Sequence, residues 1–273
     1  MDKFSKVTFI GFGLINSSLA HVFKLKTLAK ETTAFSRSKE TREKIKNLNI
    51  VDNVDDNIRE SVKDSDLIVL GVPVGAMESI VCEIAPFLKS GTIITDVGSV
   101  KKHLIDSILP ILPSDVFFVP GHPIAGTEKS GPEAGFAELF NGRWCILTPN
   151  KNTSQVALEK VKFIWEQAGM QIATMDAEYH DRVLAITSHI PHLVAFSIVG
   201  TVTELEDQLK TEVIKYSAGG FRDFTRIAAS DPIMWRDVFL NNSEAVLEML
   251  GRFIEDLTAL QKSIRWQDGD SLE

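Results

Sequence analysis

Cysteine is scarce in this chain of 273 residues. Only Cys82 and Cys145 occur, far apart in the apolar segments IVCEIA and RWCIL. Two separated thiols exclude a disulfide scaffold, and thiols in apolar segments are typical of a reducing compartment. We therefore expect a cytoplasmic protein.

Positive charge is also in short supply. The chain has 29 Lys and Arg against 37 Asp and Glu, which gives a formal net charge of −8. Binding to nucleic acid depends on clustered basic side chains that neutralise phosphates, so we expect no nucleic-acid partner. A small anionic ligand is still compatible with this charge, provided that its site is locally positive.

Long apolar runs are missing as well. A membrane-spanning helix needs about 20 predominantly apolar residues, and beyond the N-terminus no segment is expected to approach that length. Residues 1–23 have the basic start and uncharged run of a secretory signal, but two glycines and an asparagine interrupt the run. We expect no membrane association.

Short β-branched runs alternate with helical stretches over the first 175 residues. Strands are expected at 7–12, 32–36, 66–72, 92–97, 116–121, 143–149 and 171–175, with helices between or after them. This alternation predicts an α/β fold with a doubly wound, mostly parallel sheet and helices on both faces.

The pattern changes after Met175. No further strand is expected, and residues 176–206, 207–218 and 230–263 have helical periodicity. We therefore predict two domains, 1–175 and 176–273, of which the second is all-helical and suited to form a homodimer interface.

The segment GFGLIN, residues 11–16, follows the first expected strand and opens a helix. In this context G-x-G-x-x-G binds a dinucleotide pyrophosphate. Gly11 allows a tight turn, and Gly13 allows the backbone to come close to the pyrophosphate. Leu14 and Ile15 open the helix whose N-terminal amides face the phosphate charge. Asn16 replaces the third glycine of the motif. A strand–turn–helix joint without a ligand is the alternative interpretation.

The cofactor type depends on the end of the second expected strand. An NAD site has Asp or Glu there, whereas this chain has FSRS, with Ser36, Arg37 and Ser38. Hydrogen-bond donors and a cation suit a 2′-phosphate, so we predict NADP, with NAD as the alternative. Val72 and Pro73, at the end of the third expected strand, are further candidates for cofactor contact.

Three other segments concentrate small and polar residues. TDVGSVKK (95–102) and GHPIAGTEKSGPEAG (121–135) follow expected strands, and GGFRDFTRIAASDPIMWRDVF (219–239) lies in the helical half. Residues just beyond the carboxyl ends of parallel strands line the ligand crevice of doubly wound sheets. Pro123 restricts His122 to extended conformations, so the second segment is suited to holding one imidazole in a fixed direction.

With ITSHIPHLVAF (186–196), these segments resemble the prephenate/arogenate (cyclohexadienyl) dehydrogenase family of tyrosine biosynthesis. With the fingerprint near residue 11, the resemblance covers nearly the whole chain, and Asn16 is its clear departure. It implies an NAD(P)-dependent oxidative decarboxylation, in which a cyclohexadiene with a ring hydroxyl and a ring carboxylate loses a hydride and carbon dioxide and becomes a phenol. Prephenate would give 4-hydroxyphenylpyruvate, and arogenate would give tyrosine.

By motif match, His122 is the group that takes the proton of the ring hydroxyl, as a neutral imidazole can do near pH 7. Ser99 would hold His122 or that hydroxyl in line. The remaining candidates for contact with a dicarboxylate substrate are Arg226, which can grip the ring carboxylate with two hydrogen bonds, together with His192, His189, Glu128, Gly219 and Trp235. His189 and His192 lie three residues apart, but no third ligand accompanies them, so we expect no metal site.

Other interpretations stay open at this stage. A β-hydroxyacid dehydrogenase or an imine reductase shares the two-part plan, and a nucleotide-sensing protein could keep the fold without the chemistry. We favour prephenate over arogenate, because Lys129 and the two histidines provide no carboxylate for an ammonium group, although Glu128 could.

Overall fold

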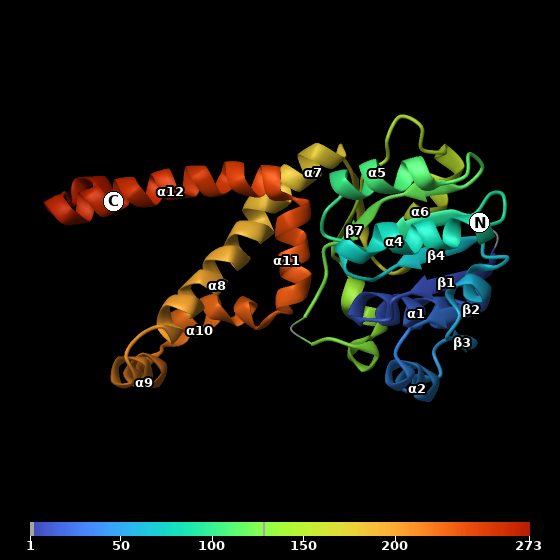
Figure 1. The fold of residues 1–273 in the computed structure, drawn as a ribbon, viewed down its shortest axis with the longest axis horizontal. Helices are drawn as coiled ribbons and strands as arrows, with labels where there is room; N and C mark the ends of the chain where they lie inside the picture. Colours follow the sequence, from blue (N-terminus) through green and yellow to red (C-terminus); the bar gives the residue numbers. More distant parts are fainter. Residues whose placement is uncertain (1–2, 128) are drawn as a thin grey trace. The chain divides into compact units, whose positions relative to one another are not determined.

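The computed structural model describes residues 3–127 and 129–273. The chain divides into two compact units, an N-terminal unit (Met1–His180) and a C-terminal unit (Asp181–Glu273) (Figure 1).

The N-terminal unit is built on a six-stranded sheet in which every neighbouring pair of strands is parallel. Its order is β3-β2-β1-β4-β5-β6. The strands are β1 (Phe4–Ile10), β2 (Ala29–Phe35), β3 (Asn53–Asp55), β4 (Leu67–Leu70), β5 (Ile93–Asp96) and β6 (Phe117–Val119). Because the order reverses at β1, a ligand crevice is expected at the carboxyl ends of β1 and β4. The predicted doubly wound fold is confirmed.

Helices cover both faces of this sheet. They are α1 (Leu14–Lys26), α2 (Lys39–Leu48), α3 (Ile58–Val62), α4 (Val74–Ile84), α5 (Lys102–Ile108) and α6 (Gln155–Gln167). Figure 1 shows α1 on one face and α4 and α5 on the other. The core between sheet and helices includes Phe9, Phe23 and Trp165, all at most 1% exposed. This packing holds the strand ends in fixed positions.

A second, three-stranded sheet follows the first. Its strands are β7 (Gly121–Pro123), β8 (Trp144–Leu147) and β9 (Gln171–Thr174), with β7 antiparallel and β9 parallel to β8. The expected strand 116–121 is therefore two strands in two sheets. Pro120 separates them, since its nitrogen cannot donate to a ladder; its carbonyl accepts from Thr148 N at 3.1 Å.

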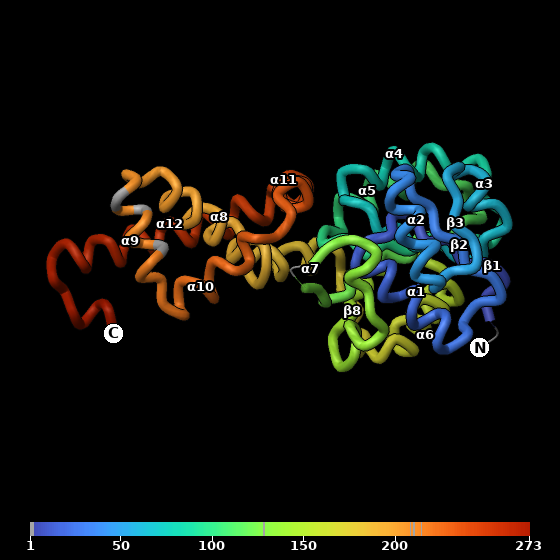
Figure 2. The backbone as a smooth tube through the Cα atoms, turned by 90° about the horizontal axis from the view of Figure 1, so that it is seen from below, coloured from blue at the N-terminus to red at the C-terminus, as the bar shows by residue number. Residues whose placement is uncertain are grey.

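The C-terminal unit is helical, as predicted. Its elements are the end of α7 (Ala177–Leu184), a π-helical turn (Ala185–His189), α8 (Ile190–Thr203), α9 (Asp207–Tyr216), α10 (Gly219–Thr225), a turn (Arg226–Ala229), α11 (Pro232–Asn241) and α12 (Ser243–Trp266). Figure 2 traces their path. A small core joins Ala185 and Ile190 to Ala245, Val246 and Met249 of α12.

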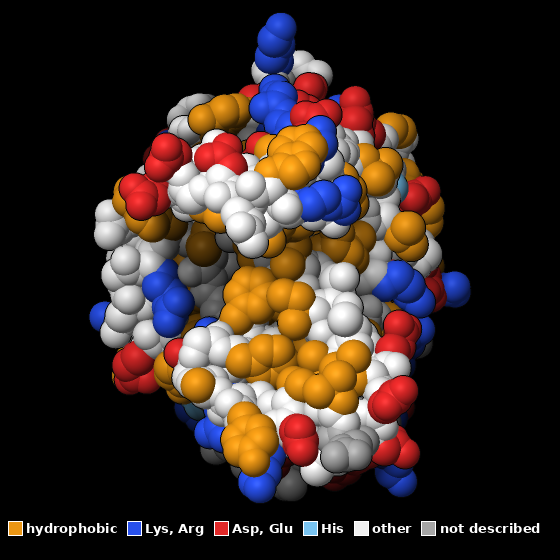
Figure 3. Space-filling view, turned by 90° about the vertical axis from the view of Figure 1, so that its left-hand side faces the viewer, with side chains coloured by type: hydrophobic (Ala, Val, Ile, Leu, Met, Phe, Trp, Pro, Cys, Tyr) orange, Lys and Arg blue, Asp and Glu red, His pale blue; other side chains and the backbone are white. Residues whose placement is uncertain are grey.

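Large apolar side chains of α12 are exposed in the single chain. Figure 3 shows hydrophobic side chains, in orange, gathered on one face of the molecule. The exposed apolar side chains of α12 are Leu247, Ile254, Leu257, Leu260, Ile264 and Trp266. A helix with an apolar face of this size is typical of a surface that another protein covers.

Residues 177–203 form a helix that is long and apolar enough to cross a membrane by length and composition, with a mean hydropathy of 1.6 over its most apolar 18 residues. The expectation that no such segment exists is wrong on this measure. Length and composition alone do not separate a membrane span from a helix whose apolar face is covered by protein.

Candidate functional site

The predicted cofactor residues lie at one edge of the six-stranded sheet. Residues 11–15 follow β1, residues 36–38 follow β2, and Val72 and Pro73 follow β4. These three strands are neighbours and all parallel, so their carboxyl ends meet at the same edge. The structure brings the three predicted segments together there.

The turn between β1 and α1 has the geometry that a dinucleotide pyrophosphate needs. Gly11 has a φ of +79°, and a Cβ there would lie 2.5 Å from Val72 Cγ1, so only glycine fits. A Cβ on Gly13 would meet no described atom within 4 Å, which leaves this side of the turn open. Among the described residues, no side chain caps α1 and no acidic residue lies in its first turn. The residues present therefore fit an NAD(P) phosphate at this helix end.

Asn16 replaces the third glycine of the motif and is almost fully buried, with 1% of its surface exposed. Its Nδ2 donates to the carbonyls of Ile10, Gly11 and Val69 at 3.3, 2.7 and 3.2 Å. The side chain occupies space beside Gly71, where a Cβ would lie 2.4 Å from Nδ2. The amide thus joins the turn to β4, and the departure from the motif leaves the turn intact.

The end of β2 presents Arg37 at the surface. Arg37 and Ser38 are exposed, and Arg42 Nη1 donates to the carbonyls of Ser36 and Arg37, both at 2.9 Å. Ser38 Oγ caps α2 by accepting from Thr41 N at 3.3 Å. The hydrogen bonds of Arg42 therefore fix the backbone of this loop, while the Arg37 side chain is exposed to solvent.

Ser99 and His122 continue the same edge. Ser99 is half-buried in the loop after β5, and His122 lies two residues beyond Pro120, past the end of β6. His122 is extended within β7, opposite Ile146 of β8, and 8% exposed. Both candidates thus lie at the sheet edge that carries the dinucleotide motif.

His180 is a partner of His122 that the sequence analysis did not identify. His122 Nδ1 lies 2.8 Å from His180 Nε2, with both rings buried. Asp176 fixes the start of α7, because its Oδ1 accepts from Glu178 N at 2.9 Å and Tyr179 N at 3.2 Å. His180 therefore falls one turn into the helix. The residue types in AEYHDRV carry no signal for this pairing, which depends on the neighbouring positions of β7, β8 and β9.

Cys145 lies beside His122 on β8, opposite Pro123, and is fully buried. Burial raises the pKa of this thiol, so it stays protonated at neutral pH. Cys145 is therefore a packing residue and not a nucleophile.

The C-terminal unit brings His192 and Trp235 into contact. The two rings stack at 3.7 Å between centroids and 22° between planes. His192 Nδ1 lies 2.8 Å from the Ser188 carbonyl and donates to it. Nε2 is therefore the ring nitrogen that remains for contact with a ligand. Burial lowers the pKa of His192, the Ser188 carbonyl opposes that shift, and the charge of Arg226 adds to it. His192 is therefore neutral near pH 7.

The other candidates differ in their surroundings. Arg226 is exposed in the turn after α10, and Gly219 begins α10 and is exposed too. His189 is fully buried, and Asn242 Nδ2 donates to its Nδ1 at 3.0 Å. Because Asn242 lies between α11 and α12, this hydrogen bond holds the two helices in place within the C-terminal unit. Glu128 lies outside the described residues.

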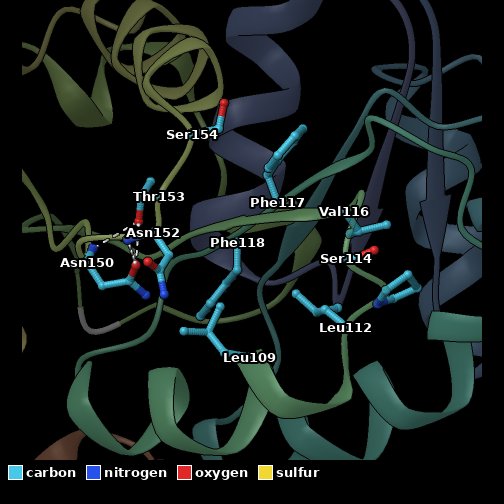
Figure 4. Close-up of a pocket in the computed structure, with 11 residues that line it drawn as sticks. Leu109, Leu112, Ser114, Val116, Phe117, Phe118, Asn150, Asn152, Thr153 and Ser154 are labelled. Atoms are coloured by element: carbon cyan, nitrogen blue, oxygen red, sulfur yellow. Dashed lines mark hydrogen bonds between the residues drawn. The ribbon is translucent and has the colours of Figure 1, made fainter.

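Other features of the described chain lie apart from these residues. A pocket of about 200 Å³ lies beside β6 (Figure 4) and is lined by Leu109, Leu112, Pro113, Ser114, Val116, Phe117, Phe118, Asn150, Asn152, Thr153 and Ser154. The polar residues of its loop form hydrogen bonds with one another: Asn150 N donates to Thr153 Oγ1 at 2.9 Å, and Asn152 N to Asn150 Oδ1 at 2.7 Å.

Within residues 3–127 and 129–273, no three His, Cys, Asp or Glu side chains form a group that could hold a metal.

Comparison with known proteins covers both units. Residues 19–174 match the model of the prephenate dehydrogenase nucleotide-binding domain, and residues 176–273 match that of the prephenate dehydrogenase dimerization domain. The chain is 44% identical to a cyclohexadienyl dehydrogenase of Zymomonas mobilis over 272 residues, which are 100% of this chain and 92% of the relative.

Two solved structures extend the comparison. A prephenate dehydrogenase from Aquifex aeolicus, in complex with hydroxyphenyl propionate and NAD+, has a TM-score of 0.90 and 36% identity, and the match covers 98% of this chain and 93% of that one. An arogenate dehydrogenase from Synechocystis has a TM-score of 0.80 and 25% identity, covering 98% and 94%. The chain belongs to the prephenate dehydrogenase family.

Proposed function

We propose that this protein catalyses the NAD(P)-dependent oxidative decarboxylation of prephenate to 4-hydroxyphenylpyruvate, with arogenate as a second substrate that would give tyrosine. The observation that carries this proposal is the position of His122. It is a buried imidazole at the same sheet edge as a glycine turn shaped for a dinucleotide. The matches to both domain models of the family support the same reaction.

In this proposal His122 acts through Nε2, and the ring proton shared with His180 is assigned to His122 Nδ1. Nδ1 lies 2.8 Å from His180 Nε2. With Nδ1 as the donor, Nε2 carries no proton and can accept the one on the ring hydroxyl. Bound NAD(P) supplies the acceptor for the hydride that leaves the same ring carbon. Loss of carbon dioxide then leaves its electron pair in the ring, and His122 returns the proton to the phenolate oxygen. His180 stabilises the imidazolium in between, as the carboxylate does in a catalytic triad.

The charged groups of the substrate need partners in an acidic protein. Arg226 is the proposed partner of the ring carboxylate, because its planar guanidinium can form two parallel hydrogen bonds. His192 Nε2 would contact the substrate side chain, and Trp235 would fix the imidazole ring of His192 by stacking against it. Ser99 would orient the hydroxyl, Gly219 would leave room for the substrate, and Glu128 would position substrate or water. His189 is a weaker candidate because it is fully buried and bonded to Asn242.

The proposed cofactor preference is NADP. Arg37 is exposed at the end of β2, and Ser38 can still donate its hydroxyl proton while its oxygen accepts from Thr41 N. A guanidinium and two hydroxyls suit a 2′-phosphate. NAD is the alternative, and the Aquifex aeolicus relative was crystallised with NAD+.

We further propose a cytoplasmic homodimer that forms through the C-terminal unit. The exposed apolar side chains of α12 would then be covered by the second copy. The match to a dimerization domain supports this assembly.

The test is a set of initial rates for prephenate and arogenate, each with NAD and NADP. We expect turnover of prephenate and a higher kcat/KM with NADP than with NAD. Cofactor binding without turnover of either substrate would overturn the proposed function. A strong preference for NAD would overturn the cofactor assignment alone.

A further inference from the structure

A buried ion pair lies behind the two candidate catalytic residues of the N-terminal unit. Asp96 ends β5, Lys101 precedes α5, and both side chains have 0% exposure. Lys101 Nζ donates to Asp96 Oδ2 and to the Gly121 carbonyl, the latter at 2.8 Å. Asp96 Oδ1 accepts from Gly121 N at 3.2 Å, and Oδ2 from Gly98 N at 2.8 Å. The pair therefore holds both polar backbone groups of Gly121 and the amide of Gly98.

These two glycines are placed one residue before the candidate catalytic side chains. Gly98 directly precedes Ser99, and Gly121 directly precedes His122. Both fit tightly: a Cβ on Gly98 would lie 3.0 Å from Asp96 Oδ2, and a Cβ on Gly121 would lie 3.1 Å from the Asp96 carbonyl. A shift of the ion pair would therefore move the backbone of both loops at once.

Stability is a poor explanation for this arrangement. A buried ion pair loses the hydration of both charges, and replacing both partners by apolar residues is often neutral or stabilising. The four hydrogen bonds instead serve geometry, since each has a fixed direction and together they join β5, the loop before α5 and β7.

We propose that the Asp96–Lys101 pair is a positioning device that fixes Ser99 and His122 relative to each other. The inference deepens the proposed function and rests on it for the roles of these two residues. Neither Asp96 nor Lys101 touches the reacting atoms in this proposal; both act through the backbone of Gly98 and Gly121.

The test is the double variant Asp96→Asn/Lys101→Met, which removes both charges together and leaves no isolated buried charge. We expect kcat to fall at least tenfold, while KM for substrate and cofactor stays within about threefold, because orientation is lost and binding groups remain. The matched control is Asp66→Asn/Lys89→Met. This ion pair, 2.6 Å between Nζ and Oδ1, precedes β4 and β5 at the opposite edge of the sheet and is partly exposed. The control should keep the wild-type kcat.

A spectroscopic readout makes the test independent of turnover. The proton between His122 and His180 should give a downfield NMR signal in the wild type and in the control, and this signal should shift or disappear in Asp96→Asn/Lys101→Met. Gly121→Ala is a milder second variant that keeps both charges; its new methyl group displaces β7, so kcat should fall with KM unchanged.

The outcomes separate the two ideas. A wild-type protein that is inactive on prephenate and arogenate would defeat the proposed function, and the NMR comparison would still decide the inference. Wild-type kcat with an unchanged signal in the double variant or in Gly121→Ala would overturn the positioning role. Failure of both variants to fold would assign the pair to stability and overturn it too.

Discussion

His122 Nδ1 and His180 Nε2 lie 2.8 Å apart in the buried interior of the N-terminal unit, with the two ring planes inclined at 64°. Two neutral imidazoles can share one hydrogen bond only if one donates and the other accepts. When His122 donates from Nδ1, its Nε2 is the basic nitrogen of the neutral ring. The direction of this hydrogen bond thus determines which nitrogen of His122 can accept a proton.

Replacing His122 by Asn should remove the proposed base while keeping a polar side chain in β7. We expect kcat to fall by roughly 10²–10⁴-fold with little change in KM, which is the usual cost of losing a general base. Steady-state kinetics with saturating cofactor measure both constants. Unchanged turnover would remove His122 from the mechanism.

Replacing His180 by Leu should cost less, because the base remains but its tautomer is no longer fixed. We expect kcat to fall by about tenfold or more, and His180→Gln, whose amide oxygen can accept from Nδ1, should recover part of it. Residues that act as one unit are not additive. His122→Asn/His180→Leu should therefore be no slower than His122→Asn alone, and a multiplied loss would indicate that the two histidines act separately.

Arg226→Ala should mainly raise KM for the substrate. A hydrogen bond to a charged group contributes about 1.5–3 kcal/mol, which corresponds to roughly 10–150-fold in KM. Arg222 provides the matched control, since it is also an exposed arginine and lies one turn earlier on α10. A normal KM in Arg226→Ala with a raised KM in Arg222→Ala would transfer the carboxylate site to Arg222.

Much of the fold follows from the sequence pattern. The β-branched runs before Gly11, Val72 and Gly98 are long and apolar enough to predict buried parallel strands, and they pair as β1, β4 and β5. The pattern misses β3 and α3, because three to five residues are too few to establish a period. It also misses the change of sheet at Pro120, because hydrophobic periodicity does not say which strands pair.

The candidate site was predictable to a different degree. Gly11 and His122 have local signatures, a glycine turn after a strand and a G-H-P segment, and the structure places both at one sheet edge. His180 has no such signature, since its contact with His122 depends on the pairing of β7, β8 and β9. The Asp96–Lys101 pair is equally hidden, because two opposite charges five residues apart most often form a solvated surface pair.

Acid should destabilise the protein through two histidines. Burial lowers the pKa of His192, with an opposing effect from the Ser188 carbonyl, and burial likewise lowers the pKa of His21 against the attraction of Glu138. The unfolded chain then takes up protons first as the pH falls. The stability is fully present above the unfolded pKa of about 6.5, and part of it is lost as the pH falls from there towards the folded values.

Urea unfolding at pH 7.5 and at pH 5.5 measures this effect. The midpoint should be lower at pH 5.5, and His192→Gln should reduce the difference between the two pH values. An equal difference in the variant would mean that His192 does not contribute to the acid sensitivity.

Asn16 offers a last test, because its amide replaces a motif glycine with a set of hydrogen bonds. Asn16→Asp keeps the shape but turns an oxygen towards the carbonyls of Ile10, Gly11 and Val69. Loss of a buried donor costs about 1–3 kcal/mol, and more where the new group is charged, so the free energy of unfolding should fall by at least that amount. Asn53→Asp is the matched control, since the Asn53 amide makes one exposed hydrogen bond to Glu31 at 3.0 Å and surface changes stay within about 0.5 kcal/mol. Equal denaturant midpoints for the two variants would show that the amide of Asn16 does not join β4 to the cofactor turn.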